Sequence, residues 1–109
     1  MSASPEFVSH VRDLLSPLGP LTDGKFFGGH AMKYEGKQFA MVMGNILYFR
    51  VNEATRSEYE KRGSTSFSYS TKRGVVQVRT YYSAPEELFE NTELLLSWAK
   101  KAIKVAATA

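Results

Sequence analysis

Two closely spaced turn signals within residues 30–51 constrain the fold of this chain more than any other feature. The pairs Glu35-Gly36 and Gly44-Asn45 each suit a two-residue turn between antiparallel strands. Gly-Asn is typical of a type II′ turn, in which glycine takes the first central position. The spacing therefore predicts three consecutive strands joined by tight hairpins.

Apolar side chains fall on both faces of this three-stranded sheet if its residues alternate strictly. One face would carry Ala31, Ala40, Val42, Leu47, Phe49 and Val51. The other face would carry His30, Met32, Phe39, Met41, Met43, Ile46, Tyr48 and Arg50. An antiparallel sheet with one wet face alternates apolar and polar residues, so the second face must be covered as well.

The cover of that second face has two interpretations, and the sequence leaves both open. Either the chain's own helices close a core on both sides of the sheet, or a second copy or a partner protein covers it. Interface cores are rich in methionine and aromatic residues, which agrees with the second interpretation. The candidate interface residues are Met32, Phe39, Met41, Met43, Ile46 and Tyr48.

Helices are predicted before, between and after the strands. Ser4 favours a helix start, and an apolar stripe at helical spacing follows it until a proline-rich segment. A short helix is predicted over residues 52–62, with capping-box spacing from Thr55 to Glu58. Asn91 is the expected cap of a final helix.

A second hairpin is predicted over residues 67–82, with its turn at Lys72-Arg73-Gly74. A two-residue or a four-residue loop would place Phe67, Tyr69, Thr71, Val76, Val78, Thr80 and Tyr82 on one face. Ser68, Ser70, Gln77, Arg79 and Tyr81 would lie opposite. The expected fold class is α+β, with an antiparallel sheet of about five strands and helices in the order α-β-β-β-α-β-β-α.

Length and composition limit the class of protein. The 109 residues predict a single domain over residues 1–109, and the lack of cysteine excludes disulfides and cysteine nucleophiles. No apolar run approaches the roughly 18–20 residues that a membrane-spanning helix needs. The N-terminus lacks the basic and apolar segments of a secretory signal. We therefore expect a cytoplasmic protein that does not contact a membrane.

The residue pattern gives little support for catalysis. The histidines are His10, on the flank of the first helix, and His30, at the start of a strand. No serine lies in a Gly-x-Ser-x-Gly turn, and no residues show metal-ligand spacing. Gly28-Gly29 lacks the spacing of a phosphate-binding loop and indicates a backbone bend or close packing. We expect no catalytic, cofactor or metal site; a ligand cleft beside His30 is the alternative.

The net charge of +3 is concentrated in the middle of the chain, where residues 52–82 carry six basic and three acidic groups. Near the tip of the second hairpin, interleaved cations and aromatics could bind phosphates and stack bases. The candidate nucleic-acid contacts are Lys72, Arg73, Arg79 and Tyr81. A solvated turn that protects an edge strand from aggregation would use the same residues.

Short motifs follow one another along nearly the whole chain. They include Phe26-Phe27-Gly28-Gly29, Tyr34-Glu35-Gly36, Phe39-Ala40-Met41-Val42, Leu47-Tyr48-Phe49-Arg50-Val51-Asn52, Lys72-Arg73-Gly74, Pro85-Glu86-Glu87-Leu88 and Leu95-Leu96-Ser97-Trp98-Ala99. In this order and spacing the chain resembles the N-terminal domain of the TfoX/Sxy competence-regulator family. The helical second domain of full-length members has no counterpart in these residues, and Val75 stands where members often carry a basic or polar residue.

The resemblance implies a bacterial cytoplasmic protein without enzymatic activity, and an α+β fold built on an antiparallel sheet. It also implies regulation of DNA-uptake genes together with the cyclic-AMP receptor protein. We therefore expect a small regulatory domain that acts through protein–protein contacts, as a homodimer or with a transcription-regulator partner. The alternatives are an accessory protein that contacts nucleic acid with its basic hairpin tip and a domain that binds a small ligand.

Overall fold

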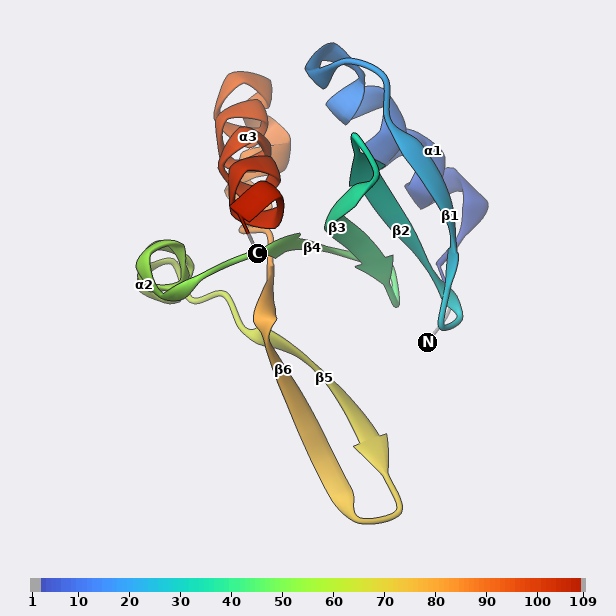
Figure 1. The fold of residues 1–109 in the computed structure, drawn as a ribbon, viewed down its shortest axis with the longest axis vertical. Coiled ribbons are helices and arrows are strands. Elements are labelled where there is room, and N and C mark those ends of the chain that lie inside the picture. The colour runs from blue at the N-terminus through green and yellow to red at the C-terminus, as the bar shows by residue number, and fades with distance from the viewer. Residues whose placement is uncertain (1–2, 109) are drawn as a thin grey trace.

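Six antiparallel strands in the order β1-β2-β3-β4-β6-β5 form one sheet, which three α-helices accompany (Figure 1). The computed structural model describes residues 3–108. The elements in chain order are α1 (Pro5–Leu15), the 3₁₀ helix η1 (Ser16–Leu18), β1 (Thr22–Phe26), β2 (Gly29–Tyr34), β3 (Lys37–Met43), β4 (Ile46–Arg50), α2 (Glu53–Lys61), β5 (Ser66–Thr71), β6 (Gly74–Ser83), the 3₁₀ helix η2 (Glu86–Glu90) and α3 (Thr92–Thr108). The α+β fold class is confirmed, with one strand beyond the five expected.

The additional strand, β1, pairs with β2 at the edge of the sheet. Its sequence Thr-Asp-Gly-Lys-Phe has no apolar alternation, and four of its five residues are exposed. Periodicity could not predict it, because a strand without a buried face leaves no apolar pattern in the sequence.

Tight turns join the first four strands, and those at Glu35-Gly36 and Gly44-Asn45 lie where the turn signals predicted them. Phe27-Gly28, Glu35-Gly36 and Gly44-Asn45 all take positive φ at both positions. Positive φ at both central residues defines a type I′ turn. The type II′ turn expected at Gly44-Asn45 is therefore wrong, because asparagine tolerates the left-handed conformation and Asn45 adopts it with φ 59°.

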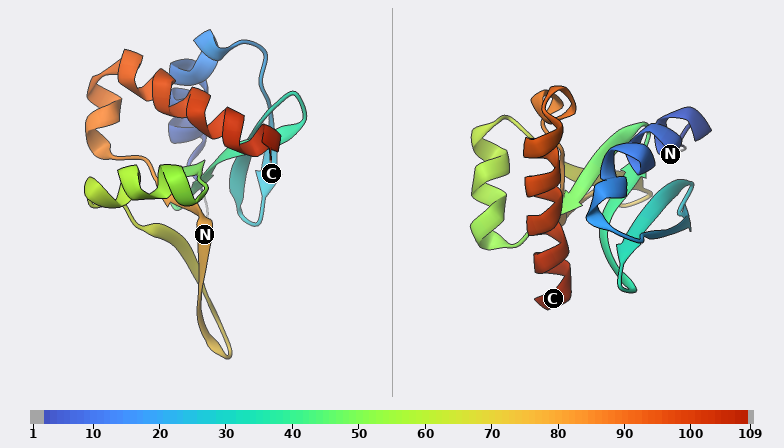
Figure 2. Two further views of the ribbon diagram at one scale, coloured as in Figure 1. Left: turned by 60° about the vertical axis from the view of Figure 1, so that its left-hand side comes forward. Right: turned by 90° about the horizontal axis from the view of Figure 1, so that it is seen from above.

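One face of the sheet packs against α1 and α3. The fully buried side chains of this layer include Leu15, Phe39, Phe49, Leu88 and Leu95. Ser4 caps α1 as predicted, since its hydroxyl accepts a hydrogen bond from the Phe7 amide at 3.2 Å. Seen from above, α3 runs between α2 and α1 (Figure 2). None of the helices within residues 3–108 combines the length and the apolar character needed to cross a membrane.

A β-bulge between β2 and β3 changes which side chains share a face. The register shifts after Met32, which pairs with Ala40 and leaves Phe39 as the extra residue. Phe39 and Ala40 are both fully buried in the helix-covered layer, and Met32 joins them there. The face assigned to Met32, Phe39 and His30 by strict alternation is therefore wrong, because one inserted residue reverses the alternation.

The second hairpin extends away from the sheet as an arm, residues 66–80 (Figure 1). Its turn has two residues, Lys72-Arg73, which is one of the predicted loop lengths. The register then shifts at the base of the arm, where Phe67 lies opposite Val78 but Ser66 lies opposite Tyr82. At this point β6 contains three residues that have no partner in β5. Because three is an odd number, the alternation of β6 side chains between the two faces reverses.

This shift exchanges the positions expected for two tyrosines. Tyr81 lies on the side of Phe67, whereas Tyr82 lies in the helix-covered layer, with its ring centroid 6.3 Å from that of Tyr59. The predicted face of Tyr82 is therefore wrong. The Tyr82 hydroxyl donates to Oε2 of Glu60 at 2.8 Å and so ties β6 to α2.

The base of the arm covers the second face of the sheet. Met41, Met43 and Tyr48 are 2%, 3% and 7% exposed, in one cluster with Phe67 and Tyr81. The rings of Tyr48 and Phe67 meet edge to face with centroids 5.3 Å apart. A hairpin of the same chain, rather than a helix or a second copy, therefore keeps water from these three residues.

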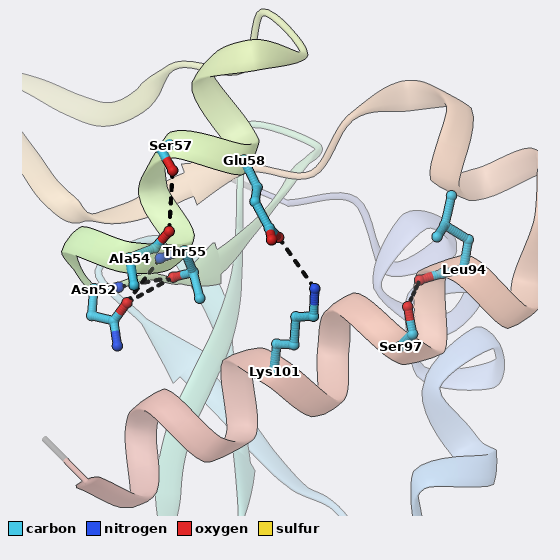
Figure 3. Close-up of polar contacts among 8 residues, drawn as sticks. All are labelled: Asn52, Ala54, Thr55, Ser57, Glu58, Leu94, Ser97 and Lys101. Atoms are coloured by element: carbon cyan, nitrogen blue, oxygen red, sulfur yellow. Dashed lines mark hydrogen bonds and ion pairs between the residues drawn. The ribbon is translucent and has the colours of Figure 1, made fainter.

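Hydrogen bonds cap the start of α2, and an ion pair joins α2 to α3 (Figure 3). The Asn52 side chain accepts from the Thr55 amide at 2.9 Å, and the Thr55 hydroxyl accepts from the Asn52 amide at 3.0 Å. The cap is therefore Asn52, and the box expected from Thr55 to Glu58 is wrong. Glu58 instead pairs with Lys101 of α3, with 3.2 Å between Oε2 and Nζ (Figure 3). The predicted cap of α3 is confirmed, since Asn91 accepts from the Leu94 amide.

Candidate protein-binding groove

An apolar groove opens between the arm and the turn that joins β1 to β2. Its volume is about 400 Å³. Its lining residues are Phe26, Phe27, Met41, Met43, Phe67, Tyr69, Val78 and Tyr81. All eight are apolar or aromatic, so the groove offers apolar surface for burial rather than groups for acid–base chemistry. We refer to this set of residues as the groove.

Phe27 forms the most exposed part of one lip of the groove. It is 82% exposed, and its ring meets that of Phe26 edge to face with centroids 4.7 Å apart. Its φ of 46° is left-handed, a conformation that costs a residue with a Cβ about 1 kcal/mol or more. Neither the exposure nor the backbone conformation stabilises the fold. A strained, exposed aromatic residue points to a role in binding.

The inner face of the arm forms the opposite lip. Tyr69 pairs with Val76, and Phe67 pairs with Val78, so these four side chains form one stripe toward the groove. Tyr69 is 45% exposed, and Val76 is exposed as well. The other face of β5 carries only serines between Ser66 and Thr71. The apolar surface therefore continues from the floor of the groove along the arm.

A cation without a counter-ion lies beside the floor of the groove. The guanidinium carbon of Arg50 is 5.8 Å from the ring centroid of Tyr81. Within residues 3–108 no carboxylate pairs with Arg50, and its Nε atom is buried without a hydrogen-bond partner. Burial raises the pKa of Tyr81, so its hydroxyl stays protonated at neutral pH and donates to the Gln38 carbonyl at 3.4 Å.

The segment that includes the arm is cationic. Between Ser66 and Thr80 the charged residues are Lys72, Arg73 and Arg79, and none is acidic. Lys72 and Arg73 lie exposed at the tip of the arm, and Arg79 is exposed near its base. The groove is therefore apolar inside, and the arm that forms one of its lips carries a charge of +3.

The structure divides the six candidate interface residues among three environments. Met32 and Phe39 lie in the core beneath the helices. Met41, Met43 and Tyr48 lie beneath the arm, and the two methionines contribute to the floor of the groove. Ile46 is 45% exposed on another surface, beside Phe7 and His10. The reason for expecting a subunit over this face is thereby removed.

The four candidate nucleic-acid residues are not brought together. Lys72 and Arg73 are exposed at the tip, and Arg79 is exposed near the base of the arm. Tyr81 is 7% exposed in the cluster beneath the arm, so its ring cannot stack on a base. The register shift of β6 separates Tyr81 from the surface that the cations occupy.

His30 lies on the side of α1 rather than in the groove. Its Nε2 atom lies 2.5 Å from Oδ2 of Asp23, which also accepts from Arg12. The hydrogen bond with His30, followed by that with Arg12, lowers the pKa of the Asp23 carboxyl below its ordinary value. These contacts tie α1, β1 and β2 together, and neither this groove nor the shallow hollow beside His10 is lined by His30.

The two adjacent glycines have a structural explanation. Gly28 takes φ 81° in the turn, and a Cβ on Gly29 would lie 2.3 Å from the carbonyl oxygen of Val42. The bend and the close packing that the sequence indicated are both present. Within residues 3–108 no three histidine, aspartate or glutamate side chains form a group that could hold a metal ion.

Sequence reasoning missed both lips of the groove. Phe27 carried a signal, because an aromatic residue directly before a glycine in a tight turn leaves its side chain with no face of the sheet to pack on. The exposure of Tyr69 could not be predicted, because an apolar stripe on a hairpin does not show how far the hairpin extends from the rest of the sheet.

Comparison with known proteins identifies a family. A family model described as the TfoX N-terminal domain matches residues 13–106 of the 109-residue chain. The match covers every strand, α2, most of α3 and the end of α1. A search of curated proteins finds no match to the chain.

Proposed function

Since the chain belongs to the TfoX N-terminal domain family, we propose that it is a non-enzymatic regulatory domain of the competence-regulator kind. It acts by protein–protein contact, and the groove is the contact surface. Its partner in this proposal is a component of the transcription machinery or a transcription regulator, and the site of action is the cytoplasm. The family match supports the regulatory role, and the groove supports the mode of contact.

The exposed apolar lips of the groove carry the proposal. An open apolar groove rimmed by polar groups is typical of a surface that binds a protein or a ligand. Phe27 and Tyr69 expose large aromatic surfaces to water on opposite lips. Aromatic side chains that enter a partner's pocket or hold its side chains supply much of the binding energy of protein interfaces.

Site-specific photocrosslinking in the native host tests this contact. A benzophenone amino acid would replace Phe27, and, in a second strain, Val75, which is exposed on the outer face of the arm. We expect a discrete, protease-sensitive adduct from position 27 and none from position 75. Equal labelling at both positions, or none at position 27, would contradict the proposed surface.

The regulatory role is tested by transcript profiles of three strains. We expect Phe27→Asp to reproduce the changes caused by deletion of the gene, and the uncharged variant Val75→Ser to leave the wild-type profile. If deletion itself changes no transcript, the regulatory role is wrong. If deletion changes transcripts but Phe27→Asp does not, the role stands and the groove is not its surface.

A second candidate function is nucleic-acid binding by the arm. A two-stranded ribbon fits the major groove of DNA, and the arm carries exposed cations at its tip without a nearby acidic residue in sequence. Each phosphate contact should contribute a log–log salt slope of about −0.9. We expect the double variant, with Lys72→Ala and Arg73→Ala, to make the slope shallower by the contribution of about two phosphate contacts. If binding does not change with the salt concentration, or if this double variant does not weaken it, the arm is not the nucleic-acid contact.

A homodimer is the remaining choice of partner. Because Met41 and Tyr48 are buried within one chain, a second copy would have to contact the exposed lips of the groove instead. The same crosslinking experiment identifies this case, since the adduct would have twice the 12.2 kDa mass of the chain.

A further inference from the structure

The outer edge of β5 is a free strand edge that borders the groove. β5 stands last in the sheet order, and among residues 3–108 it pairs only with β6. Thr71 and Gly74 flank the two-residue turn, so they form a pair that exchanges both hydrogen bonds. The hydrogen bonds alternate along the strand, and the N–H and C=O groups of Ser68 and Ser70 therefore point outward.

The two strands that end the sheet order, β1 and β5, differ in their protection against strand pairing. β1 carries Asp23, Gly24 and Lys25, and charges and glycine discourage the addition of a strand. β5 reads Ser-Phe-Ser-Tyr-Ser-Thr, without charge, proline or glycine. An unprotected edge beside an apolar groove is the arrangement in which an extended peptide adds a strand and places alternate side chains in pockets.

The surrounding charge selects among the occupants of this edge. The arm carries the cations Lys72, Arg73 and Arg79 and no acidic residue between Ser66 and Thr80. A second copy of the chain, paired through β5, would bring together two arms of the same charge. An acidic segment would instead meet charges of opposite sign.

We propose that the free edge of β5 binds an extended, acidic segment of a partner protein as a seventh strand. Alternate apolar side chains of that segment enter the groove beside Phe67 and Tyr69. Its acidic side chains point away from the groove and are attracted by Lys72 and Arg73 at the tip of the arm and by Arg79 near its base. This inference rests on the proposed function, because it specifies the chemistry of the partner that the groove holds.

Synthetic peptides of about ten residues, the length of a long strand, provide the test. In one peptide valine alternates with glutamate, and in its control valine alternates with lysine. Fluorescence polarisation of labelled peptides measures their affinity for the whole chain. We expect the glutamate peptide to bind about tenfold more tightly than the lysine peptide, and the difference to shrink in high salt.

Two substitutions at one position separate strand addition from other binding. Ser70→Pro removes an outward N–H group, which β6 does not use, so the hairpin tolerates it. Ser70→Ala removes only the hydroxyl and is the matched control. We expect Ser70→Pro to weaken the glutamate peptide about tenfold and Ser70→Ala less than about twofold. Amide hydrogen exchange at Ser68 and Ser70 of the wild-type chain should slow about tenfold in the complex, a readout independent of the folding of Ser70→Pro.

Each other outcome overturns the inference and identifies an alternative. Binding that is lost in Phe27→Asp but leaves the Ser68 and Ser70 amides unprotected shows that the groove works without strand addition, and the proposed function stands. Protection of these amides without peptide, with a doubled mass, identifies a second copy. Full competition by single-stranded DNA identifies nucleic acid. If the glutamate peptide does not bind at about 1 mM, the proposal that the edge of β5 binds an acidic strand is wrong.

Discussion

Phe27 illustrates how a single residue can oppose stability while it serves binding. Asparagine adopts a left-handed backbone more readily than phenylalanine, so Phe27→Asn relieves strain and offsets the lost contact with Phe26. We expect the free energy of unfolding to fall by no more than about 0.5 kcal/mol. Binding at the groove should nevertheless be lost. Urea titration and fluorescence polarisation with the glutamate peptide measure these two effects, and a large loss of stability would assign Phe27 to the fold.

Gly29 shows the opposite case, a residue that only packing explains. A Cβ at this position would lie 2.2 Å from Sδ of Met43 and 2.3 Å from the Val42 carbonyl oxygen, and the backbone atom cannot move aside. We expect Gly29→Ala to destabilise the chain by about 1–3 kcal/mol in urea unfolding. Gly24→Ala is the control, because no atom lies within 4 Å of its Cβ position. Equal effects of the two variants would contradict this explanation.

Asp23 predicts a dependence of stability on pH. Its pKa lies below the ordinary 3.8, because His30 and Arg12 donate hydrogen bonds to the carboxylate. A lowered folded-state pKa adds stability above pH 3.8 that is lost as the pH falls through the folded-state value. We expect Asp23→Asn to cost about 0.5–1 kcal/mol at neutral pH, discounted for partial exposure. The cost should vanish in acid; an unchanged cost there would refute the contribution.

At the scale of elements, the arm acts as a cover for the sheet as well as a binding surface. Phe67→Ala removes the ring that meets Tyr48 and leaves Met41 and Met43 open to water. We expect a loss of about 2–4 kcal/mol, as for other buried aromatic truncations. Tyr69→Ala, on the same face of β5 but 45% exposed, should cost less than about 1 kcal/mol. Thermal unfolding distinguishes the two, and similar losses would show that the arm does not act as a cover.

The elements that the sequence predicted correctly have local causes. Ser4 and Asn91 cap helices, and the Gly-containing pairs turn hairpins, through contacts within a few residues. The two bulges have no such local signal. Phe39 could be accommodated as an extra residue only because its side chain finds room beneath α1 and α3, which are distant in sequence.

At the scale of the whole molecule, the coverage of both sheet faces within one chain predicts a monomer in dilute solution. Met41→Glu would bury a carboxylate among the apolar side chains of the cluster beneath the arm. We expect this variant to lower the free energy of unfolding by several kcal/mol and leave the mass at 12.2 kDa. Light scattering at tens of micromolar measures the mass. A dimer that this variant dissociates without unfolding would restore an interface on this face.

The sequence alone determined the strands from residue 30 to 51, the helix caps at Ser4 and Asn91, and the presence of apolar surface on both sides of the sheet. These features depend on neighbours along the chain, whose spacing the sequence displays directly. Only the tertiary structure decided what covers the second face and which apolar residues remain exposed as a groove. A hairpin and a helix can bury the same methionine equally well, and the choice follows from two register shifts that depend on the packing of the whole molecule.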